Sequence, residues 1–433
     1  MRWFRSCSAE GRLAAVLMRR ALTVGLLVAG LLVLLMLLLL ASDQRTSHAY
    51  RALLPPPPQQ LLSMAGDDGP KMAGDDSDNC VPRDSIFFLK THKCASSTVQ
   101  NILMRYGEKH SLNFVLGSTG NYVGSPTPFN RLFIPDWLWP RSGKFDVFAH
   151  HTRLHVAETR RVMQDHAAWV TILRDPVAQF ESAFDYYHFA IPQHWNMTLR
   201  QFIALPLERK QALARIGHGR FGGSQMAFDL GYDPAIVSEP RLVQAMLDDL
   251  DKAFDLVMIA EMMDESLVLL RQLMCWSTDD VIYLTKNARF DALRTPMSRA
   301  DRAALEEFLE LDMILYRHFR QRLAQQIAAV PIATFLARTE ALVARCLHYK
   351  QRCVASEAKG SELQGQQHEI TDRVKGYRLI DSSDWMCSRL GMAEIGYTDL
   401  LRDGQRQRMA IWRRVYGLLG MDVGAPQQPE ERT

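Results

Sequence analysis

A polar loop at residues 90–98 carries the first side chains that could do chemistry. It reads Lys90-Thr-His-Lys-Cys-Ala-Ser-Ser-Thr98, follows the apolar run 86–89 and precedes a helical pattern. Free backbone N–H groups converge where a strand passes through a loop into a helix, and the helix dipole favours an anion there. Lys93 adds charge and three hydroxyls add donors, so the loop is expected to bind a phosphate-like group. A capped helix with surface lysines is the alternative, whereas a kinase is disfavoured because G-x-x-x-x-G-K-[ST] is absent from this loop.

A second candidate anion site lies in Ile172-Leu-Arg-Asp-Pro176, with Ser182 downstream. Arg174 would stand at the carboxyl end of a strand, where open α/β sheets bind ligands. Asp175-Pro176 is a favourable helix start, and Ser182 would lie about two turns into that helix. Arg174 and Ser182 could then bind one phosphate, with the guanidinium in bidentate geometry. A surface pair of Arg174 with Asp175 is the alternative.

A histidine cluster, His150-His-Thr-Arg-Leu-His155, follows another apolar run. A histidine titrates near neutrality, so a member of this cluster could serve as a general base. Zinc is a rival, because His151 and His155 would share a face if this stretch were helical. No third ligand is nearby in the sequence, so no metal is expected. A plain surface cluster of histidines is the other alternative.

The sequence around these side chains has the pattern of strands that alternate with helices. Short apolar runs at 86–89, 145–149, 169–173 and 256–260 are separated by helical patterns, including one that ends near residue 107 and one at 265–274. Such alternation predicts the α/β class, with a central parallel sheet flanked by helices. Residues 301–350 are expected to be helical and to pack on this sheet. Beyond Cys387 the pattern weakens.

The N-terminal part has the pattern of a membrane anchor followed by a stem. Residues 21–41 are almost wholly apolar, and a helix of this length spans about 31 Å, enough for a hydrocarbon core of about 30 Å. The arginines before it place residues 1–20 in the cytosol and the rest in the lumen. Residues 42–79 are expected to form a flexible stem, 80–420 the catalytic domain and 421–433 a polar tail. A cleaved signal peptide is the alternative.

Composition and cysteine use set further limits. The 433 residues are 47% hydrophobic with a formal net charge of +3, which describes a globular protein and gives no reason to expect a nucleic-acid partner. Asn196-Met-Thr198 is a glycosylation acceptor pattern. In an oxidising lumen disulfides can form. If Cys94 faces a nucleotide it stays free with at least one other cysteine, and Cys346–Cys387 is a first guess for a bridge.

The two anion-binding motifs resemble the nucleotide-binding elements of carbohydrate sulfotransferases, and the chain is similar to the galactose-3-O-sulfotransferase family within that group. Longer matching runs lie at 228–233, 259–261, 264–270, 279–281, 287–289 and 311–319. The resemblance covers residues 80 to 400. It implies a P-loop-like sulfotransferase fold, no metal, and a single-pass type II Golgi membrane protein with a lumenal catalytic domain. It also implies sulfuryl transfer from 3′-phosphoadenosine-5′-phosphosulfate to the 3-OH of galactose in glycolipid or glycoprotein glycans.

The same resemblance assigns roles to individual residues. Lys93 is expected to stabilise the departing 5′-phosphate oxygen, and His151 to deprotonate the acceptor hydroxyl. The residues expected to bind the donor are Lys90, His92, Lys93, Ala95, Ser96, Ser97, Thr98, Arg174 and Ser182. Aromatic residues that could stack on the acceptor sugar are Trp137, Trp139, Tyr186, Tyr187 and Trp195.

A few positions depart from the family pattern. Cys94 stands where the family usually has Thr, and the departures at Thr152, Leu154 and Ser224 are expected to lie near the acceptor. They leave two other functions open: a sulfotransferase for another sugar hydroxyl, as in the uronyl 2-O type, and a Golgi glycan-binding protein without catalysis. Whether the protein forms a homo-oligomer is also left open.

Overall fold

The computed structural model describes residues 80–190, 197–216, 223–286, 288, 290, 295–369 and 371–418. All of these residues belong to the compact unit Lys71–Thr433. The expected cytosolic tail, membrane anchor, stem and polar tail, together with Asn196 and Trp195, lie outside the described residues. Within the described ranges, no single helix has the length and apolar composition to cross a membrane, and only the bent pair Glu310–Ala328 with Ile332–Cys353 would do so by those criteria.

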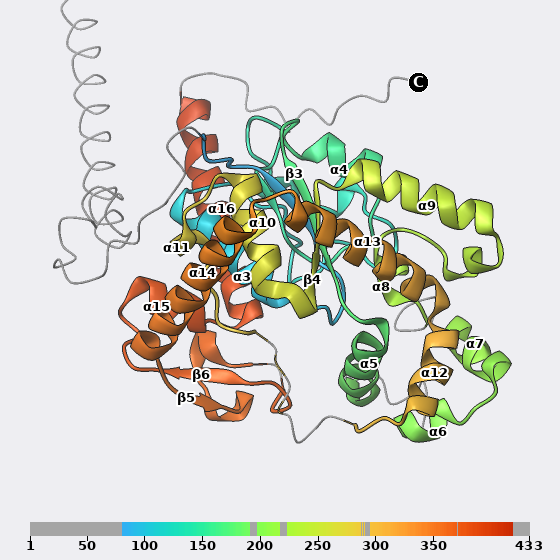
Figure 1. Ribbon diagram of the computed structural model, residues 1–433. Coiled ribbons are helices and arrows are strands. Elements are labelled where there is room, and N and C mark those ends of the chain that lie inside the picture. Colours follow the sequence, from blue (N-terminus) through green and yellow to red (C-terminus); the bar gives the residue numbers. More distant parts are fainter. Residues whose placement is uncertain are drawn as a thin grey trace, which may run out of the picture. The chain divides into compact units, whose positions relative to one another are not determined.

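A parallel sheet of four strands forms the centre of this unit (Figure 1). The spatial order is β2-β1-β3-β4, with Ile86 paired to both Val147 and Ala168, and Val170 paired to Leu256. All four strands are fully buried, as expected where helices cover both faces. The strands are β1 (Ile86–Leu89), β2 (Val147–Phe148), β3 (Ala168–Leu173) and β4 (Leu256–Ile259). The predicted central sheet is confirmed.

Aromatic packing ties the central strands together. The ring of Phe87 on β1 meets Phe148 on β2 at 5.3 Å and Trp169 on β3 at 4.6 Å between centroids, both edge to face. Phe87 is fully buried, and burial of such a side chain stabilises a fold by roughly 1.5–3 kcal/mol. The ends of these strands, and the loops that leave them, are therefore held in fixed positions.

Helices connect and cover the strands (Figure 1). Asp175 begins the helix after β3, since its Oδ1 accepts the N–H of Ala178 at 2.9 Å, as Asp-Pro predicts. The helices that directly follow the strands are α3 (Ser96–Lys109), α4 (Val156–Val162), α5 (Pro176–Ala190) and α10 (Met263–Met274). The other helices up to residue 353 are α6 (Leu199–Ile203), α7 (Leu207–Ile216), α8 (Gln225–Asp229), α9 (Pro240–Ala253), α11 (Thr278–Val281), α12 (Arg299–Phe308), α13 (Glu310–Ala328) and α14 (Ile332–Cys353). Helix α13 contacts β4 and α14 contacts α10, which confirms the helices expected at 301–350.

The C-terminal part contains a hairpin and two helices that the sequence did not predict. Strand β5 (Val354–Ala358) pairs antiparallel with β6 (Gly376–Leu379), and α15 (Trp385–Gly391) and α16 (Glu394–Leu418) follow. Helix α16 packs on α3, where the buried Tyr397 donates its hydroxyl hydrogen to Glu108 at 2.7 Å. The last helix thus returns to the helix that begins at the polar loop.

The structure pairs four of the cysteines. Cys80 is bonded to Cys275 and Cys353 to Cys387, with Cα atoms 5.8 and 5.0 Å apart. Cys94 and Cys346 are unpaired, which confirms that Cys94 and one other cysteine stay free. The guess of a Cys346–Cys387 bridge is wrong. Cys346 lies about two turns earlier on α14 than Cys353, and its sulfur accepts the N–H of Tyr283 at 3.4 Å.

Candidate active site

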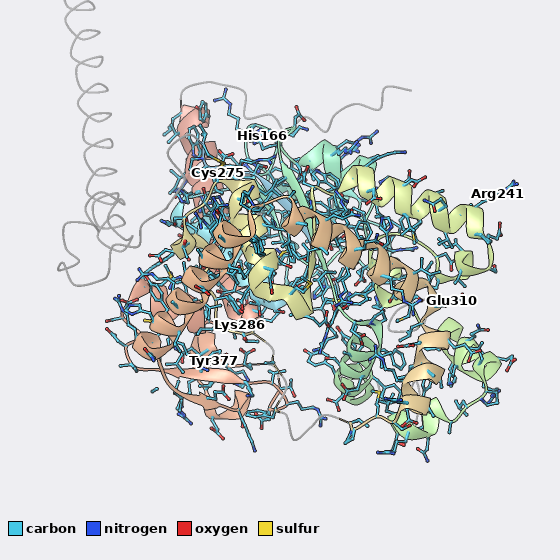
Figure 2. The ribbon with its side chains drawn as sticks, viewed as in Figure 1. His166, Arg241, Cys275, Lys286, Glu310 and Tyr377 are labelled. Carbon is cyan, nitrogen blue, oxygen red and sulfur yellow. A yellow bond between two sulfur atoms is a disulfide. The ribbon has the colours of Figure 1, made fainter. Side chains whose placement is uncertain are left out.

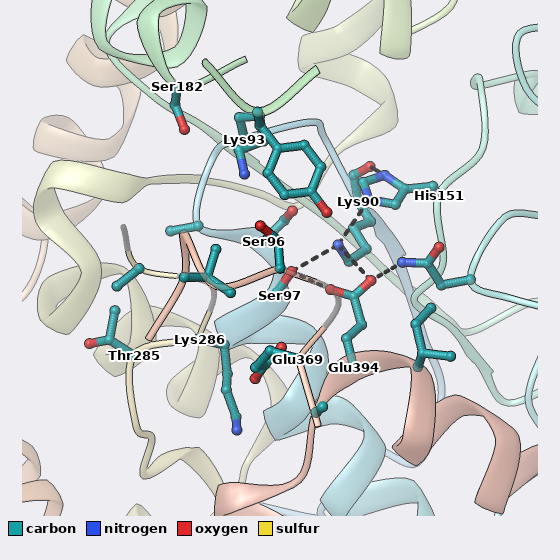
Figure 3. A pocket seen from close by; sticks show the side chains of 18 of the residues that line it. Lys90, Lys93, Ser96, Ser97, His151, Ser182, Thr285, Lys286, Glu369 and Glu394 are labelled. Atoms are coloured by element: carbon teal, nitrogen blue, oxygen red, sulfur yellow. Dashed lines mark hydrogen bonds and ion pairs between the residues drawn. The ribbon is translucent and has the colours of Figure 1, made fainter. Parts of the chain in front are cut away.

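A cavity of about 430 Å³ lies at the carboxyl ends of the strands (Figure 3). Loops after all four strands contribute to its wall, which is the arrangement by which open parallel sheets bind ligands. The residues of the three sequence motifs that line it are Lys90, Lys93, Ala95, Ser96, Ser97, His151, Arg174 and Ser182. Side chains that are far apart in the sequence are therefore gathered around one space.

The loop after β1 presents its backbone to this cavity. Lys93 and Ala95 have φ values of 60° and 59°, left-handed values that are unfavourable for residues with a Cβ and are typical of functional loops. Ala95 is the N-cap of α3 and supplies no side-chain cap. The hydroxyl of Ser96 donates to the Thr91 carbonyl at 2.6 Å, and that of Ser97 donates to Glu394. The hydroxyl hydrogens of Ser96 and Ser97 are therefore directed to protein acceptors, and α3 lacks the side-chain cap that the capped-helix alternative required.

Lys90 is held in a buried network. Its Nζ lies 3.1 Å from Ser97 Oγ, 3.0 Å from His151 Nε2 and 3.3 Å from Glu394 Oε1 (Figure 3). An ammonium has three hydrogens, so these three contacts use them all. Burial lowers the pKa of Lys90, and the neighbouring carboxylate of Glu394 opposes that shift. Lys90 lines the cavity and is hydrogen-bonded to these side chains, so its expected contact with the donor stays a prediction.

The contacts of His151 define its tautomer. Nδ1 lies 2.9 Å from the carbonyl oxygen of Lys90, which can only accept, so Nδ1 carries the hydrogen. Nε2 faces the Lys90 ammonium, which can only donate, so Nε2 presents its lone pair. Burial, and then the positive charge of Lys90, hold the pKa of His151 well below its ordinary value of 6.5. His151 is therefore a neutral imidazole in the cavity wall, and its Nε2 lone pair accepts a hydrogen from Lys90.

His92 and Thr98, which were expected to bind the donor, do not line the cavity. His92 is buried, with Nδ1 2.9 Å from Asp229 and Nε2 3.1 Å from the hydroxyl of Tyr122. Its ring stacks on that of His151, with centroids 4.2 Å apart. The hydroxyl of Thr98 accepts the backbone N–H of Lys286 at 2.9 Å. Both residues support the wall of the site from behind.

His150 and Cys94 are also buried away from the cavity. His150 Nε2 lies 3.1 Å from the hydroxyl of Thr398, and burial lowers its pKa to about 3. Burial raises the pKa of the Cys94 thiol. The alternation of His150 and His151 to opposite sides agrees with an extended segment.

The metal alternative required a helix that is not formed. His155 begins α4 as its N-cap, with Nδ1 accepting the N–H of Glu158 at 3.2 Å, and residues 151–154 precede that helix. His151 and His155 therefore do not share a helical face. Among the residues that the structure describes, no group of three histidine, cysteine or acidic side chains is placed to hold a metal ion.

Arg174 and Lys93 meet on the other side of the cavity. Arg174 donates from Nη1 to the carbonyl oxygen of Lys93 at 3.0 Å. The Nζ of Lys93 lies 3.8 Å from the ring centroid of Tyr186, and Ser182 lines the same space (Figure 3). Asp175 forms its ion pair with Arg302, so the surface pair of Arg174 with Asp175 is not the arrangement seen.

Comparison with known proteins identifies the family to which this chain belongs. The family model described as galactose-3-O-sulfotransferase matches residues 9–405. The chain belongs to this family. It is 33% identical to galactosylceramide sulfotransferase of Homo sapiens over 339 residues, covering 73% of this chain and 78% of that relative. It is also 33% identical to galactose-3-O-sulfotransferase 2 of Sus scrofa, covering 73% and 83%, and to galactose-3-O-sulfotransferase 3 of Homo sapiens, covering 75% and 78%. No solved structure matches.

Membership of the galactose-3-O-sulfotransferase family makes the protein a sulfotransferase and implies 3′-phosphoadenosine-5′-phosphosulfate as co-substrate. The cavity can be tested for its fit to such an anion. Lys286 lines it and is buried, and among the described residues its Nζ has no hydrogen-bond partner, although the charge of Glu369 acts on it. A buried ammonium without such a partner is costly unless an anion binds beside it. With Lys93 and Arg174, this lysine gives a site of suitable charge, and the cavity volume is typical of ligand sites.

The sequence did not identify several residues of this galactose-3-O-sulfotransferase site. They are Asn121, Tyr122, Thr285, Lys286, Glu369 and Glu394. The only signal near any of them was the matching run at 287–289, which begins just after Lys286. Burial lowers the pKa of Lys286 to about 8, and its Nζ lies 5.5 Å from the ring centroid of Tyr377 (Figure 2).

The departures from the family pattern lie outside the cavity wall. Thr152, Leu154 and Ser224 are all buried, and none of them lines the cavity. The expectation that they lie near the acceptor stays a prediction, but their side chains are not part of the cavity wall. Of the expected stacking residues, Tyr186 and Tyr187 line the cavity, whereas Trp139 is buried with Nε1 donating to the Ile134 carbonyl at 3.4 Å.

Proposed function

We propose that this protein transfers a sulfuryl group from 3′-phosphoadenosine-5′-phosphosulfate to the 3-OH of a terminal galactose in a glycolipid or glycan. The observation that carries the proposal is the meeting of Lys93, Arg174 and His151 around one cavity at three separate strand ends. The printed names of the relatives, galactosylceramide sulfotransferase and galactose-3-O-sulfotransferase, support galactose as the acceptor sugar.

The roles of the residues follow from charge and position. The donor, when bound, supplies the sulfuryl group and a phosphate leaving group. Lys93 and the backbone N–H groups of residues 95–97 would stabilise negative charge on the leaving oxygen, which is the main source of catalysis in transfers of this kind. Arg174 and Ser182 would hold the phosphate that is remote from the reaction.

His151 would act as the general base. Its Nε2 carries the lone pair and would take the proton of the acceptor hydroxyl, while the hydroxyl oxygen forms the new bond to sulfur. The bond between sulfur and the bridging phosphate oxygen breaks, and its electron pair stays on that oxygen. Tyr186 and Tyr187 line the cavity and would offer ring faces and hydroxyls to the acceptor sugar.

Transfer of labelled sulfate to a panel of acceptors tests the proposal. We expect β-galactosides to accept sulfate and 3-deoxy-galactosides not to, because the latter lack the reacting oxygen. Sulfation of a uronic acid but not of galactose would assign the enzyme to another acceptor. Binding of glycan without any transfer, in a protein that fails to bind the product nucleotide, would indicate a glycan-binding protein.

We also propose a single-pass type II Golgi membrane protein, with residues 21–41 as its anchor and the catalytic domain in the lumen. The support is the apolar run with arginines before it. Replacement of residues 1–41 by a cleavable secretion signal should release a soluble, active enzyme. Secretion of folded but inactive protein would contradict the assignment of the domain to residues 80–420.

A further inference from the structure

Glu394 is the acidic residue at the centre of the site, although it comes from the last helix. It is the first residue of α16 and lines the cavity, where a carboxylate is favoured by the positive end of the helix dipole. Its two oxygens accept hydrogen bonds from Ser97 and Asn121, and Oε1 lies 3.3 Å from Lys90 Nζ (Figure 3). This carboxylate thereby connects helix α16 to the polar loop at residues 90–98, which would bind the donor.

Lys90 links this carboxylate to His151. The Lys90 ammonium lies between Glu394 Oε1 at 3.3 Å and His151 Nε2 at 3.0 Å. The lone pair that would accept the hydroxyl proton is therefore already used by a Lys90 hydrogen. For proton transfer, the hydrogen bond between Lys90 and His151 Nε2 must break so that the sugar hydroxyl can approach this nitrogen. The Lys90 ammonium then needs another hydrogen-bond acceptor nearby.

The charges of the three groups also change during the reaction. Neutral His151, cationic Lys90 and anionic Glu394 together carry no net charge. When His151 takes a proton, the group carries one positive charge. Without the carboxylate it would carry two, buried and in contact, which is strongly unfavourable in a site of low dielectric constant.

We propose that Glu394 is a positioning residue for the general base, acting through its ion pair with Lys90. When the acceptor hydroxyl reaches His151 Nε2, the Lys90 ammonium leaves that nitrogen and keeps Glu394 as its acceptor. The carboxylate also balances the positive charge that His151 gains with the proton. This inference rests on the proposed function of His151. The step breaks the hydroxyl O–H bond and forms an N–H bond on Nε2, while Lys90 keeps its three ammonium hydrogens and Glu394 stays a carboxylate.

Glu394 is not itself the base in this scheme. Burial alone would raise its pKa, but the charge of Lys90 and the hydrogen bonds from Ser97 and Asn121 hold the pKa of Glu394 below its ordinary value. A carboxylate that accepts this many hydrogen bonds is a weak proton acceptor. The second cavity glutamate, Glu369, has its pKa raised by burial, and its buried Oε1 has no hydrogen-bond partner within the part of the chain that the structure describes.

Two single substitutions should shift the pH dependence in opposite directions. Activity requires neutral His151, so the acid limb of kcat follows the pKa of His151. Lys90→Met removes a positive neighbour, which raises that pKa and should move the limb to higher pH. Glu394→Gln removes a negative charge, which lowers that pKa and should move the limb to lower pH. It should also reduce plateau kcat by about 10- to 100-fold, because a less basic group is a weaker catalyst.

The other titratable groups around His151 are unchanged in these variants. They come from the β1–α3 loop, the segment before residue 151, the loop at 121–122, α5 and α8, and they are His92, His150, Tyr122, Tyr187 and Asp229. Binding of 3′-phosphoadenosine-5′-phosphate, measured by calorimetry, should stay within about threefold of the parent in Glu394→Gln. The control Asp403→Asn removes a charge from an exposed position on the same helix and should leave the pH profile in place.

The double variant Lys90→Met/Glu394→Gln removes both charges of the pair and leaves neither unpaired. It is therefore expected to fold even if a single variant does not, and it keeps the inference testable. Its acid limb should lie between those of the two singles. An acid limb that stays at the parent pH in all three variants would overturn the inference, whatever the loss of kcat. If His151→Ala itself keeps the acid limb, His151 is not the base and the proposed mechanism fails with the inference.

Discussion

Lys90 holds both ring nitrogens of His151, Nδ1 with its backbone carbonyl at 2.9 Å and Nε2 with its side-chain ammonium at 3.0 Å. The residue directly after β1 therefore sets the orientation and the tautomer of the proposed base, which follows β2. Since these strands are neighbours in the sheet, the geometry of the base depends directly on their register.

Substitution of the proposed base gives the first prediction. His151→Ala should lower kcat by about 10²- to 10⁴-fold, the usual contribution of general base catalysis. Binding of 3′-phosphoadenosine-5′-phosphate should change little, because the proposed donor contacts are on other loops. The acid limb of the parent profile is expected on the acid side of pH 6.5, since burial and Lys90 lower the pKa of His151. His150→Ala is the matched control: it should lower the melting temperature by loss of the Thr398 contact and leave the limb intact.

Lys93 and Arg174 should affect different kinetic constants. Lys93→Ala should reduce kcat by about 10²- to 10³-fold, the scale for removal of one preorganised group at the developing charge. Arg174→Ala should mainly raise the donor KM, because its phosphate is remote from the reacting bond. Steady-state kinetics at varied donor concentration separates the two. Equal and small effects of both substitutions would contradict the assigned roles.

Replacement of Lys286 should stabilise the folded protein and weaken its binding of nucleotide. Its pKa is lowered from 10.5 to about 8 by burial, and at about 1.4 kcal/mol per unit this corresponds to roughly 3 kcal/mol. The folded state therefore loses stability below pH 8, where Lys286 is charged, and recovers it between pH 8 and 10.5. Lys286→Met should raise the free energy of unfolding at pH 7 by up to that amount, with a smaller gain above pH 9.

The same variant should bind 3′-phosphoadenosine-5′-phosphate more weakly, at least tenfold by calorimetry, if the nucleotide pairs with this ammonium. Lys359→Met, at an exposed lysine of the C-terminal part, should change neither quantity. A Lys286→Met protein with unchanged nucleotide affinity would place the phosphates elsewhere in the cavity.

Disulfide mapping by mass spectrometry should find Cys80–Cys275 and Cys353–Cys387, with Cys94 and Cys346 as free thiols. Cys353→Ser with Cys387→Ser should destabilise the protein by about 2–4 kcal/mol, the common range for a loop of this size. Cys346→Ser should have a smaller effect, and a bridge involving Cys94 would contradict the loop geometry.

The sequence predicts those parts of the fold that depend on local patterns. The apolar runs at 86–89 and 169–173 could only be buried strands, and Asp175-Pro176 marks the start of a helix because both effects act within a few residues. The hairpin of β5 and β6 left no comparable signal, since three of the five residues of β5 are exposed. Helix α16 was missed because it lies beyond the point where the apolar pattern weakened.

The residues of the candidate site also differ in whether a local sequence pattern could identify them. Lys93, His151 and Arg174 could be found because each lies in the loop that follows an apolar strand, and the strand places the start of that loop. Glu394 could not be found, because its role depends on an ion pair with Lys90 across more than three hundred residues. His92 was expected to bind the donor but does not line the cavity, because a polar residue in a loop can face the cavity or the protein and only tertiary packing decides.

The place of Glu394 at the start of the last helix has a consequence for biosynthesis. A growing chain can assemble the four-stranded sheet once residue 259 has been made, and the donor loop, the histidine and the arginine are then all present. The carboxylate that accompanies Lys90 is added only near the end of translation. A transcript that stops shortly before codon 394 would therefore encode a chain that has the four strands, the loops that follow them and Lys90, but lacks the carboxylate that accompanies this lysine beside the proposed base.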